Sequence, residues 1–158
     1  MRITRFLCYF SKKKWVLAPA AGNVLPIDQV KDDVFSSKMM GGGFAITDHN
    51  GKIFAPITGS IVDVFPTKHA ITLKTESGAV VLVHMGLDTV EMEGNPFTIL
   101  VEKGQEIRAS DPLALMDIRA LASADKDSVL IVVLVEDDGV LQINRGQVNW
   151  GEKLFYYQ

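Results

Sequence analysis

Hydrophobic residues fall along this chain in short runs that are separated by Gly, Pro, Asn and Asp. Runs rich in Val, Ile, Thr and Phe with such boundaries are typical of β-strands. The runs predict strands at 15–17, 22–27, 43–47, 52–55, 60–64, 70–74, 79–84, 97–101, 113–117, 129–136 and 154–157. Only 118–124 carries apolar residues at helical spacing. The pattern therefore predicts an all-β protein with one or two short helical turns.

Two pairs of short segments resemble each other within the chain. Leu17-Ala18-Pro19-Ala20-Ala21-Gly22-Asn23-Val24 recurs as Phe54-Ala55-Pro56-Ile57-Thr58-Gly59-Ser60-Ile61, and 103–111 is loosely repeated by 145–152. Each segment starts at an Ala-Pro turn or a glycine-led corner, which suits a repeated sheet-building unit. We expect a β-sandwich built from related halves, and chance similarity among small residues is the alternative.

Two histidines lie on either side of a predicted turn, Thr75-Glu76-Ser77-Gly78. In a symmetric hairpin, His69 is directly opposite His84, with Cβ atoms roughly 4.5–5.5 Å apart. Because side chains alternate along a strand, a shift of one residue would separate the two imidazoles. The face predicted to carry them comprises Phe65, Thr67, His69, Ile71, Leu73, Val80, Leu82 and His84. This face is apolar except at one end, so we expect the imidazoles in a shallow depression where it meets water.

Length, cysteine content and charge narrow the classes of function. The chain has 158 residues and one cysteine, Cys8, which excludes an internal disulfide and suits a reducing compartment. The net charge is −3, and no basic stripe with aromatic platforms follows the first residues, so we do not expect nucleic-acid binding. We expect a single domain over 15–158 in a cytoplasmic protein.

Residues 1–14 form a basic and aromatic leader. Its apolar run, 6–10, is too short for a signal peptide or a membrane span, and Lys12, Lys13 and Lys14 follow it. We expect a mobile leader, and weak contact with an anionic membrane surface is the alternative.

A pair of facing imidazoles suits phosphoryl transfer. Neutral imidazole is a competent nucleophile, and the reaction asks mainly for positioning and for donors to the phosphoryl oxygens. The Thr67 hydroxyl could fix the ring of His69. The sequence has no glycine-rich ATP-binding loop, so a phosphoprotein donor is expected instead of ATP. On spacing alone, an incidental histidine pair remains open.

The same residues carry a resemblance to a known family. Phe54-Ala55-Pro56-Ile57-Thr58-Gly59, Thr67-Lys68-His69-Ala70 and above all Val83-His84-Met85-Gly86-Leu87-Asp88-Thr89-Val90 resemble the glucose-type enzyme IIA component of the bacterial sugar phosphotransferase system. With supporting strings, the likeness covers about residues 17–155. It implies a compact antiparallel β-sandwich that needs no cofactor.

The resemblance also implies roles for individual residues. His84 would accept a phosphoryl group on Nε2 from the histidine-containing phosphocarrier protein and pass it to a cysteine of a sugar-specific IIB domain. His69 would stabilise the phosphoryl oxygens, and Thr67 would orient His69. The residues expected to contact partners are Asp32, Val34, Met40, Phe65 and Asp88. Lys68, Asp33 and Met40 depart from the residues common in the family, which leaves the choice of partners open.

Three other readings of the sequence remain. A zinc-dependent peptidase-like domain would need a third ligand besides His69 and His84. The remaining histidine, His49, lies in a turn signal and is expected to be solvated. A transient zinc ion bound by His69 and His84 at a partner interface is conceivable. A lipoyl or biotinyl carrier would use Lys126, which follows a helical segment and not a hairpin tip. A regulatory binding module, read by other proteins, is compatible with phosphocarrier function.

Overall fold

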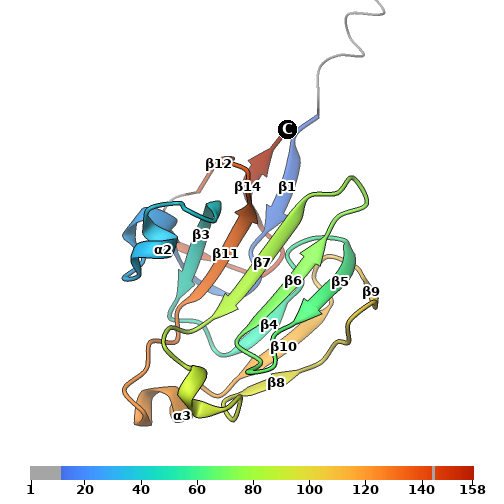
Figure 1. The fold of residues 1–158 in the computed structure, drawn as a ribbon. Helices are drawn as coiled ribbons and strands as arrows, with labels where there is room; N and C mark the ends of the chain where they lie inside the picture. Colours follow the sequence, from blue (N-terminus) through green and yellow to red (C-terminus); the bar gives the residue numbers. More distant parts are fainter. Residues whose placement is uncertain (1–11, 144) are drawn as a thin grey trace, which may run out of the picture.

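The structure is a computed structural model that describes residues 12–143 and 145–158. Its strands pair antiparallel into an eight-stranded sheet, in the order β13-β2-β3-β11-β7-β6-β5-β9, and two three-stranded sheets, β1-β14-β12 and β4-β10-β8 (Figure 1). The strands are β1 (Lys14–Leu17), β2 (Gly22–Pro26), β3 (Gly41–Thr47), β4 (Lys52–Phe54), β5 (Gly59–Val64), β6 (Ala70–Lys74), β7 (Val80–Met85), β8 (Phe97–Ile99), β9 (Glu106–Ile107), β10 (Pro112–Met116), β11 (Leu130–Val135), β12 (Val140–Leu141), β13 (Gln147–Val148) and β14 (Lys153–Tyr157). The all-β prediction is confirmed.

Within 12–143 and 145–158, helical structure is limited to short turns: η2 (Ile27–Gln29), α2 (Asp33–Ser36), η3 (Val90–Met92) and α3 (Ile118–Ser123). The predicted helix at 118–124 is α3, and it begins where Asp117 accepts a hydrogen bond from the Ala120 amide at 3.0 Å. The sequence pattern missed α2, which is capped by Asp32. No helix among the described residues has the length and apolar character needed to cross a membrane.

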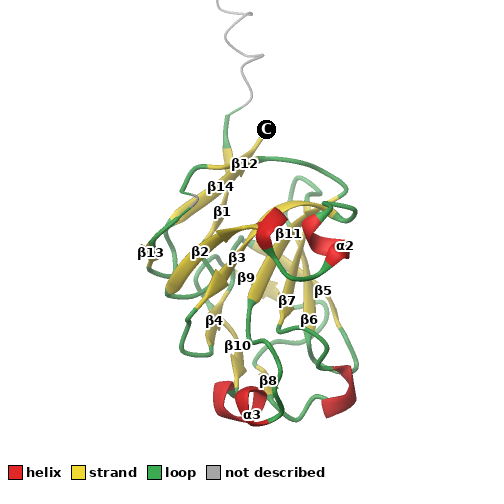
Figure 2. Ribbon diagram, turned by 90° about the vertical axis from the view of Figure 1, so that its left-hand side faces the viewer, coloured by secondary structure: helices red, strands yellow, loops and turns green. Residues whose placement is uncertain are grey.

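The larger hydrophobic core lies between one face of the eight-stranded sheet and the two small sheets. Phe44, Ile71, Val83 and Val132 fill it from the large sheet. A second, smaller cluster covers part of the opposite face, where η2 and α2 pack (Figure 2). Its members are Ile27, Val30, Phe35, Ala45, Ala70, Leu82, Leu87, Val129, Ile131 and Val133. Because only short helical turns cover that face, part of it remains accessible.

Equivalent hydrogen bonds relate the two Ala-Pro segments. The Leu17 amide donates to the Pro56 carbonyl at 2.9 Å, and the Phe54 amide donates to the Pro19 carbonyl at 2.7 Å. The second pair of repeated segments, 103–111 and 145–152, makes matching hydrogen bonds. The Gly151 amide donates to the Ala18 carbonyl at 2.9 Å, and the Ser110 amide donates to the Ala55 carbonyl at 2.7 Å. The repeated segments therefore occupy equivalent places around a local two-fold relation, which supports the prediction of related halves.

The predicted limits of the leader and of the strands differ in detail from the structure. β1 begins at Lys14, so the last residue assigned to the leader belongs to the sheet, and residues 1–11 lie outside the described residues. β9, β12 and β13 were not predicted. Each has only two residues, which is too short for an alternation pattern to be recognised.

Candidate functional site

The register of the β6–β7 hairpin differs by one residue from the prediction. Ala70, not His69, is paired with His84, and Ile71 is paired with Val83. The predicted face is therefore wrong: Ile71 joins the larger core, whereas Ala70 lies with His84. The physical reason is that the connection runs from Thr75 to Ala79, where the Thr75 amide donates to the Ala79 carbonyl at 2.9 Å, so the loop is one residue longer than the symmetric turn.

The two imidazoles nevertheless meet, with ring centroids 5.1 Å apart and planes at 73°. His69 precedes β6 and follows Lys68, which has a φ of 59° in the left-handed region, so strand alternation does not extend to it. The Met85 amide donates to the His69 carbonyl at 2.7 Å, which attaches the turn to the strand that carries His84. The contact of the rings thus depends on the turn and not on the predicted register.

His84 projects from the middle of the eight-stranded sheet. Its neighbours across the strands are Ala70 of β6 and Ile131 of β11, and the ring edge of Phe35 from α2 lies against it, with centroids 4.9 Å apart. Burial, and then the nearby His69, lower the pKa of His84 to about 4, while a backbone interaction with Gly86 and the charge of Asp32 act in the opposite direction. The imidazole is therefore neutral at neutral pH.

Two buried polar atoms lie near the end of β7, one on His84 within the strand and one on Thr89 after it. Nδ1 of His84 and the hydroxyl of Thr89 have no good hydrogen-bond partner among the described residues. Thr89 is 2% exposed and packs against Gly86, since a Cβ placed on Gly86 would lie 3.0 Å from its Cγ2. Gly86 has a φ of 74°, and that Cβ would also lie 2.9 Å from the Asp127 carbonyl oxygen. The glycine is thus required beneath His84.

His69 is half-buried and is fixed by its neighbours in the turn. The Thr67 hydroxyl hydrogen-bonds its Nδ1, and the edge of the Phe65 ring lies against it with centroids 5.3 Å apart. Burial lowers the pKa of His69, which favours the neutral ring. If the hydroxyl donates to Nδ1, the proton of the neutral ring is on Nε2, where it is available to an acceptor.

The residues predicted to contact partners differ in their exposure. Val34 and Phe65 are 46% and 37% exposed. Asp32 caps α2 by accepting from the Val34 amide at 3.0 Å, so its carboxylate has a structural role as well. Met40 is half-buried against the second cluster, and Asp88 is exposed with a φ of 54°. Phe65 contacts His69 and the charge of Asp32 acts on His84, whereas a contact of the five residues with a partner stays a prediction.

The expectation that His49 is solvated is wrong. The side chain is 7% exposed; its Nε2 lies 2.7 Å from the Ser128 carbonyl oxygen, and its Nδ1 accepts from the Gly51 amide at 3.1 Å. Burial lowers its pKa, against the opposing effects of the Ser128 bond and of Asp48. A turn signal in sequence gives no information about the second segment that covers the turn, which is why the burial was missed.

Other polar features lie away from the histidines. Lys126 follows α3 and forms an ion pair with Glu91, consistent with a surface lysine.

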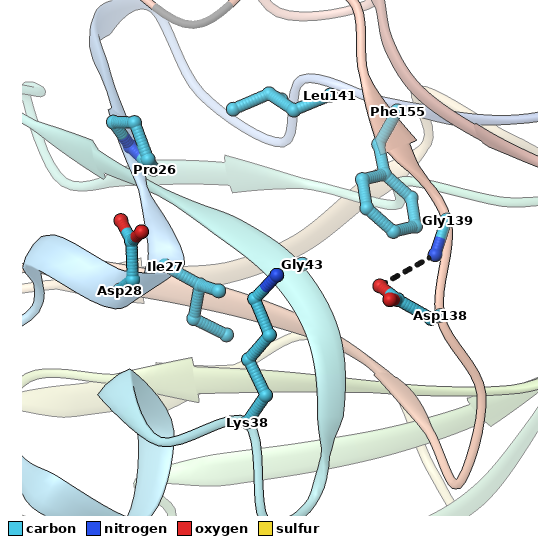
Figure 3. A pocket seen from close by; sticks show the side chains of 9 residues that line it. All are labelled: Pro26, Ile27, Asp28, Lys38, Gly43, Asp138, Gly139, Leu141 and Phe155. Atoms are coloured by element: carbon cyan, nitrogen blue, oxygen red, sulfur yellow. Dashed lines mark hydrogen bonds between the residues drawn. The ribbon is translucent and has the colours of Figure 1, made fainter.

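A cavity of about 90 Å³ lies between β2, β3 and the segment before β12. Lys38 extends along it, and Asp28 and Asp138 line it (Figure 3). Neither His69 nor His84 lines this cavity. Across 12–143 and 145–158, no group of three His, Cys, Asp or Glu side chains is placed to hold a metal ion.

Sequence reasoning did not find Phe35, Gly86 and Thr89 as parts of this site. Phe35 contacts His84 from α2, a distant segment with no local signal for the contact. Gly86 and Thr89 belong to the string after His84 that carried the family resemblance, so their positions were visible in the sequence but their structural roles were not.

Comparisons with known proteins agree with this fold. The chain is 38% identical over 146 residues to the glucose-specific EIIA component of the phosphotransferase system (PTS) of Mycoplasma capricolum subsp. capricolum, covering 91% of this chain and 95% of that protein. It is 41% identical over 123 residues to that of Staphylococcus epidermidis, covering 78% and 74%. It also matches a PTS glucose-specific EIICBA component of Streptococcus pneumoniae at 44% over 128 residues, 81% of this chain but only 18% of that protein.

A solved structure extends the comparison to three dimensions. The glucose permease IIA from Mycoplasma capricolum superposes with a TM-score of 0.82 at 36% identity, covering 94% of this chain and 97% of that one. The family model described as phosphoenolpyruvate-dependent sugar phosphotransferase system, EIIA 1, matches residues 14–140. This match includes both strands of the histidine hairpin and all the elements around it. The chain therefore belongs to the EIIA 1 family of the phosphoenolpyruvate-dependent sugar phosphotransferase system.

Proposed function

We propose that this phosphotransferase component carries a phosphoryl group on Nε2 of His84 between a phosphoprotein donor and a sugar permease. The observation that carries the proposal is the contact of two neutral imidazoles, 5.1 Å apart between centroids, at the border of a partly covered sheet face. Strands on both sides hold His84, and burial removes the competing proton from its ring. A nucleophilic nitrogen is thus available without a separate base.

The transfer balances without moving a proton. The lone pair of His84 Nε2 attacks the phosphorus of a phosphohistidine on the donor, the new N–P bond forms, and the N–P bond of the donor breaks with its electron pair returning to the donor imidazole. His84 keeps its proton on Nδ1 throughout. His69, whose Nδ1 is engaged by Thr67, offers its Nε2 proton to a phosphoryl oxygen and so stabilises the charge that the group brings.

The partners follow from the family. We propose the histidine-containing phosphocarrier protein as donor and the cysteine of a IIB domain as acceptor. Val34 and Phe65 supply exposed apolar surface beside the histidines, and Asp32 and Asp88 supply negative charge that would complement a basic partner surface. The relatives named above are glucose-specific, so glucose is the first sugar to test. A soluble phosphoprotein donor would place this function in the cytoplasm.

Zinc is not required by this chemistry. His69 and His84 supply two nitrogens, and zinc sites in proteins ordinarily use at least three protein ligands. A zinc ion here would therefore need a further ligand from a docked partner, such as a carboxylate. Elemental analysis of the isolated protein and of its partner complex distinguishes these cases.

The test is incubation with labelled phosphoenolpyruvate, the general phosphotransferase enzyme and the phosphocarrier. We expect label on the wild type that is lost in acid and survives base, and none on His84→Gln. His69→Gln should still be charged but should fail in onward transfer to the IIB domain. Lys153→Gln, on β14 in a different sheet, is the control for substitution as such and should keep the label. Charging of His84→Gln, or loss of charging in His69→Gln alone, would contradict the assigned roles.

A further inference from the structure

His49 joins two distant backbone segments through both of its ring nitrogens. It lies between β3 and β4 and is 7% exposed. Nδ1 accepts a hydrogen bond from the Gly51 amide at 3.1 Å, so it carries no proton, and the proton on Nε2 is donated to the Ser128 carbonyl at 2.7 Å. Each nitrogen therefore has one defined partner, and the tautomer is fixed.

The segment that receives this hydrogen bond also holds the backbone that follows His84. The Gly86 amide donates to the Val129 carbonyl at 2.8 Å, and the Leu87 amide donates to the Asp127 carbonyl at 3.1 Å. Ser128, which His49 binds, lies between these two acceptors. The position of both carbonyls is therefore tied to the residue that the imidazole anchors.

Gly86 has little freedom to follow a movement of this segment independently. A Cβ on Gly86 would lie 2.9 Å from the Asp127 carbonyl oxygen, so the two backbones are in close contact. Gly86 follows His84 by two residues, so its backbone position constrains the end of β7 that carries His84. Displacement of 127–129 is thus transmitted to the ring through a short, packed connection.

We propose that His49 is a positioning residue for phosphoryl transfer: by anchoring Ser128 it fixes the strand-end backbone that holds Gly86 and Leu87, and through them the ring of His84. The inference rests on the proposed function in taking His84 as the phosphoryl acceptor. The hydrogen bond that matters is the one from Nε2 to Ser128, whereas the Nδ1 bond to Gly51 serves to fix the tautomer and the local turn.

Two substitutions separate the two hydrogen bonds. In His49→Gln the amide nitrogen can take the place of Nε2 and keep the bond to Ser128, whereas in His49→Asn the amide oxygen can take the place of Nδ1 and keep the bond to Gly51. Amide hydrogen exchange is measured at Gly86 and Leu87, with the Ala55 amide, bonded to Asp111 at 2.8 Å in another part of the fold, as the internal control. The initial rate of charging by the phosphocarrier is measured on the same samples.

In His49→Asn we expect exchange at Gly86 and Leu87 to become about tenfold faster, with Ala55 unchanged, and charging to slow by about the same factor. In His49→Gln both should remain close to wild type. Amide exchange can be measured without phosphorylation. If the wild type is never phosphorylated, the proposed function is contradicted, but exchange at Gly86 and Leu87 still tests whether His49 holds this backbone.

Several outcomes would overturn the inference. These are unchanged exchange at Gly86 and Leu87 in a folded His49→Asn, faster exchange there with a normal charging rate, and equal behaviour of the two variants. If His49→Asn does not fold, faster exchange at Gly86 in His49→Gln is sufficient to reject it. Failure of both variants to fold would show a general structural role in place of the local one.

Discussion

Replacing His84 with glutamine should make the folded protein less sensitive to acid. The pKa of His84 is lowered from 6.5 to about 4, first by burial and then by His69. In the unfolded chain the imidazole titrates near its ordinary value, so the unfolded state binds a proton at a higher pH than the folded state does. The stability due to neutral His84 is therefore fully present above about pH 6.5 and is lost as the pH falls toward 4.

The expected size of this effect follows from the two pKa values. Proton linkage through His84 lowers the free energy of unfolding by about 2 kcal/mol at about pH 5, and by about 3 kcal/mol at about pH 4, relative to neutral pH. Burial also lowers the pKa of His49 and of His69, so the whole protein should lose more than this. The difference between wild type and His84→Gln isolates the share that belongs to His84.

Urea unfolding at about pH 7.5 and about pH 5 measures this difference. The wild type should lose about 2 kcal/mol more than His84→Gln between the two conditions. In His69→Gln the change in acid sensitivity should be smaller, because burial of His84, the larger cause of its lowered pKa, is kept while the smaller contribution of His69 is removed. Equal pH dependence of wild type and His84→Gln, or an NMR titration of His84 near 6.5, would refute the reasoning.

Three further predictions concern the neighbours of the histidines. Gly86→Ala should lower the free energy of unfolding by about 1–3 kcal/mol, measured by urea unfolding, because its φ is 74° and the new Cβ meets the Asp127 carbonyl. Thr89→Val should raise it by about 1 kcal/mol in the same assay, because a buried hydroxyl that has no hydrogen-bond partner among the described residues is replaced by a methyl group. Thr67→Val should leave charging intact and slow onward transfer about tenfold in single-turnover experiments, because His69 loses the bond that orients it.

The strands were predictable because each is a short run rich in β-branched and other apolar residues that is bounded by Gly, Pro, Asn or Asp, even where, as in β3 and β11, the strand is buried along almost its whole length. β6, from Ala70 to Lys74, was predicted with both its ends, and β3 and β11 differ from the prediction only at their ends. The repeated Ala-Pro segments were equally visible, and their reciprocal hydrogen bonds show what the repetition encodes. Features set by contacts between distant segments, such as the packing of Phe35 on His84 and of His49 on Ser128, have no local pattern from which they could be read.

The meeting of His69 and His84 was predicted, but for the wrong reason. Cross-strand pairing requires both residues to belong to the ladder, and His69 does not. A left-handed residue, Lys68, changes the direction of the chain before β6, and the stem of that lysine packs on Gly94, where an added Cβ would lie 3.2 Å from its Cδ. Alternation arguments therefore fail at the last residue before a strand, where backbone direction is set by turn geometry.

This difference in how the rings are held suits the two roles proposed for them. His84 is fixed by strands on both sides, which keeps its nucleophilic nitrogen in one position for two successive partners. His69 is held in a turn by the hydrogen bond between the Thr67 hydroxyl and its Nδ1 and by contact with Phe65, so Nε2 is the nitrogen left for a phosphoryl oxygen. Both roles gain from preorganisation: displacement of a nucleophile lengthens the reacting distance, and a donor already in place needs no reorganisation when the phosphoryl charge arrives. The position within the ladder, held by strands on both sides, is therefore the structural argument for proposing His84 as the acceptor.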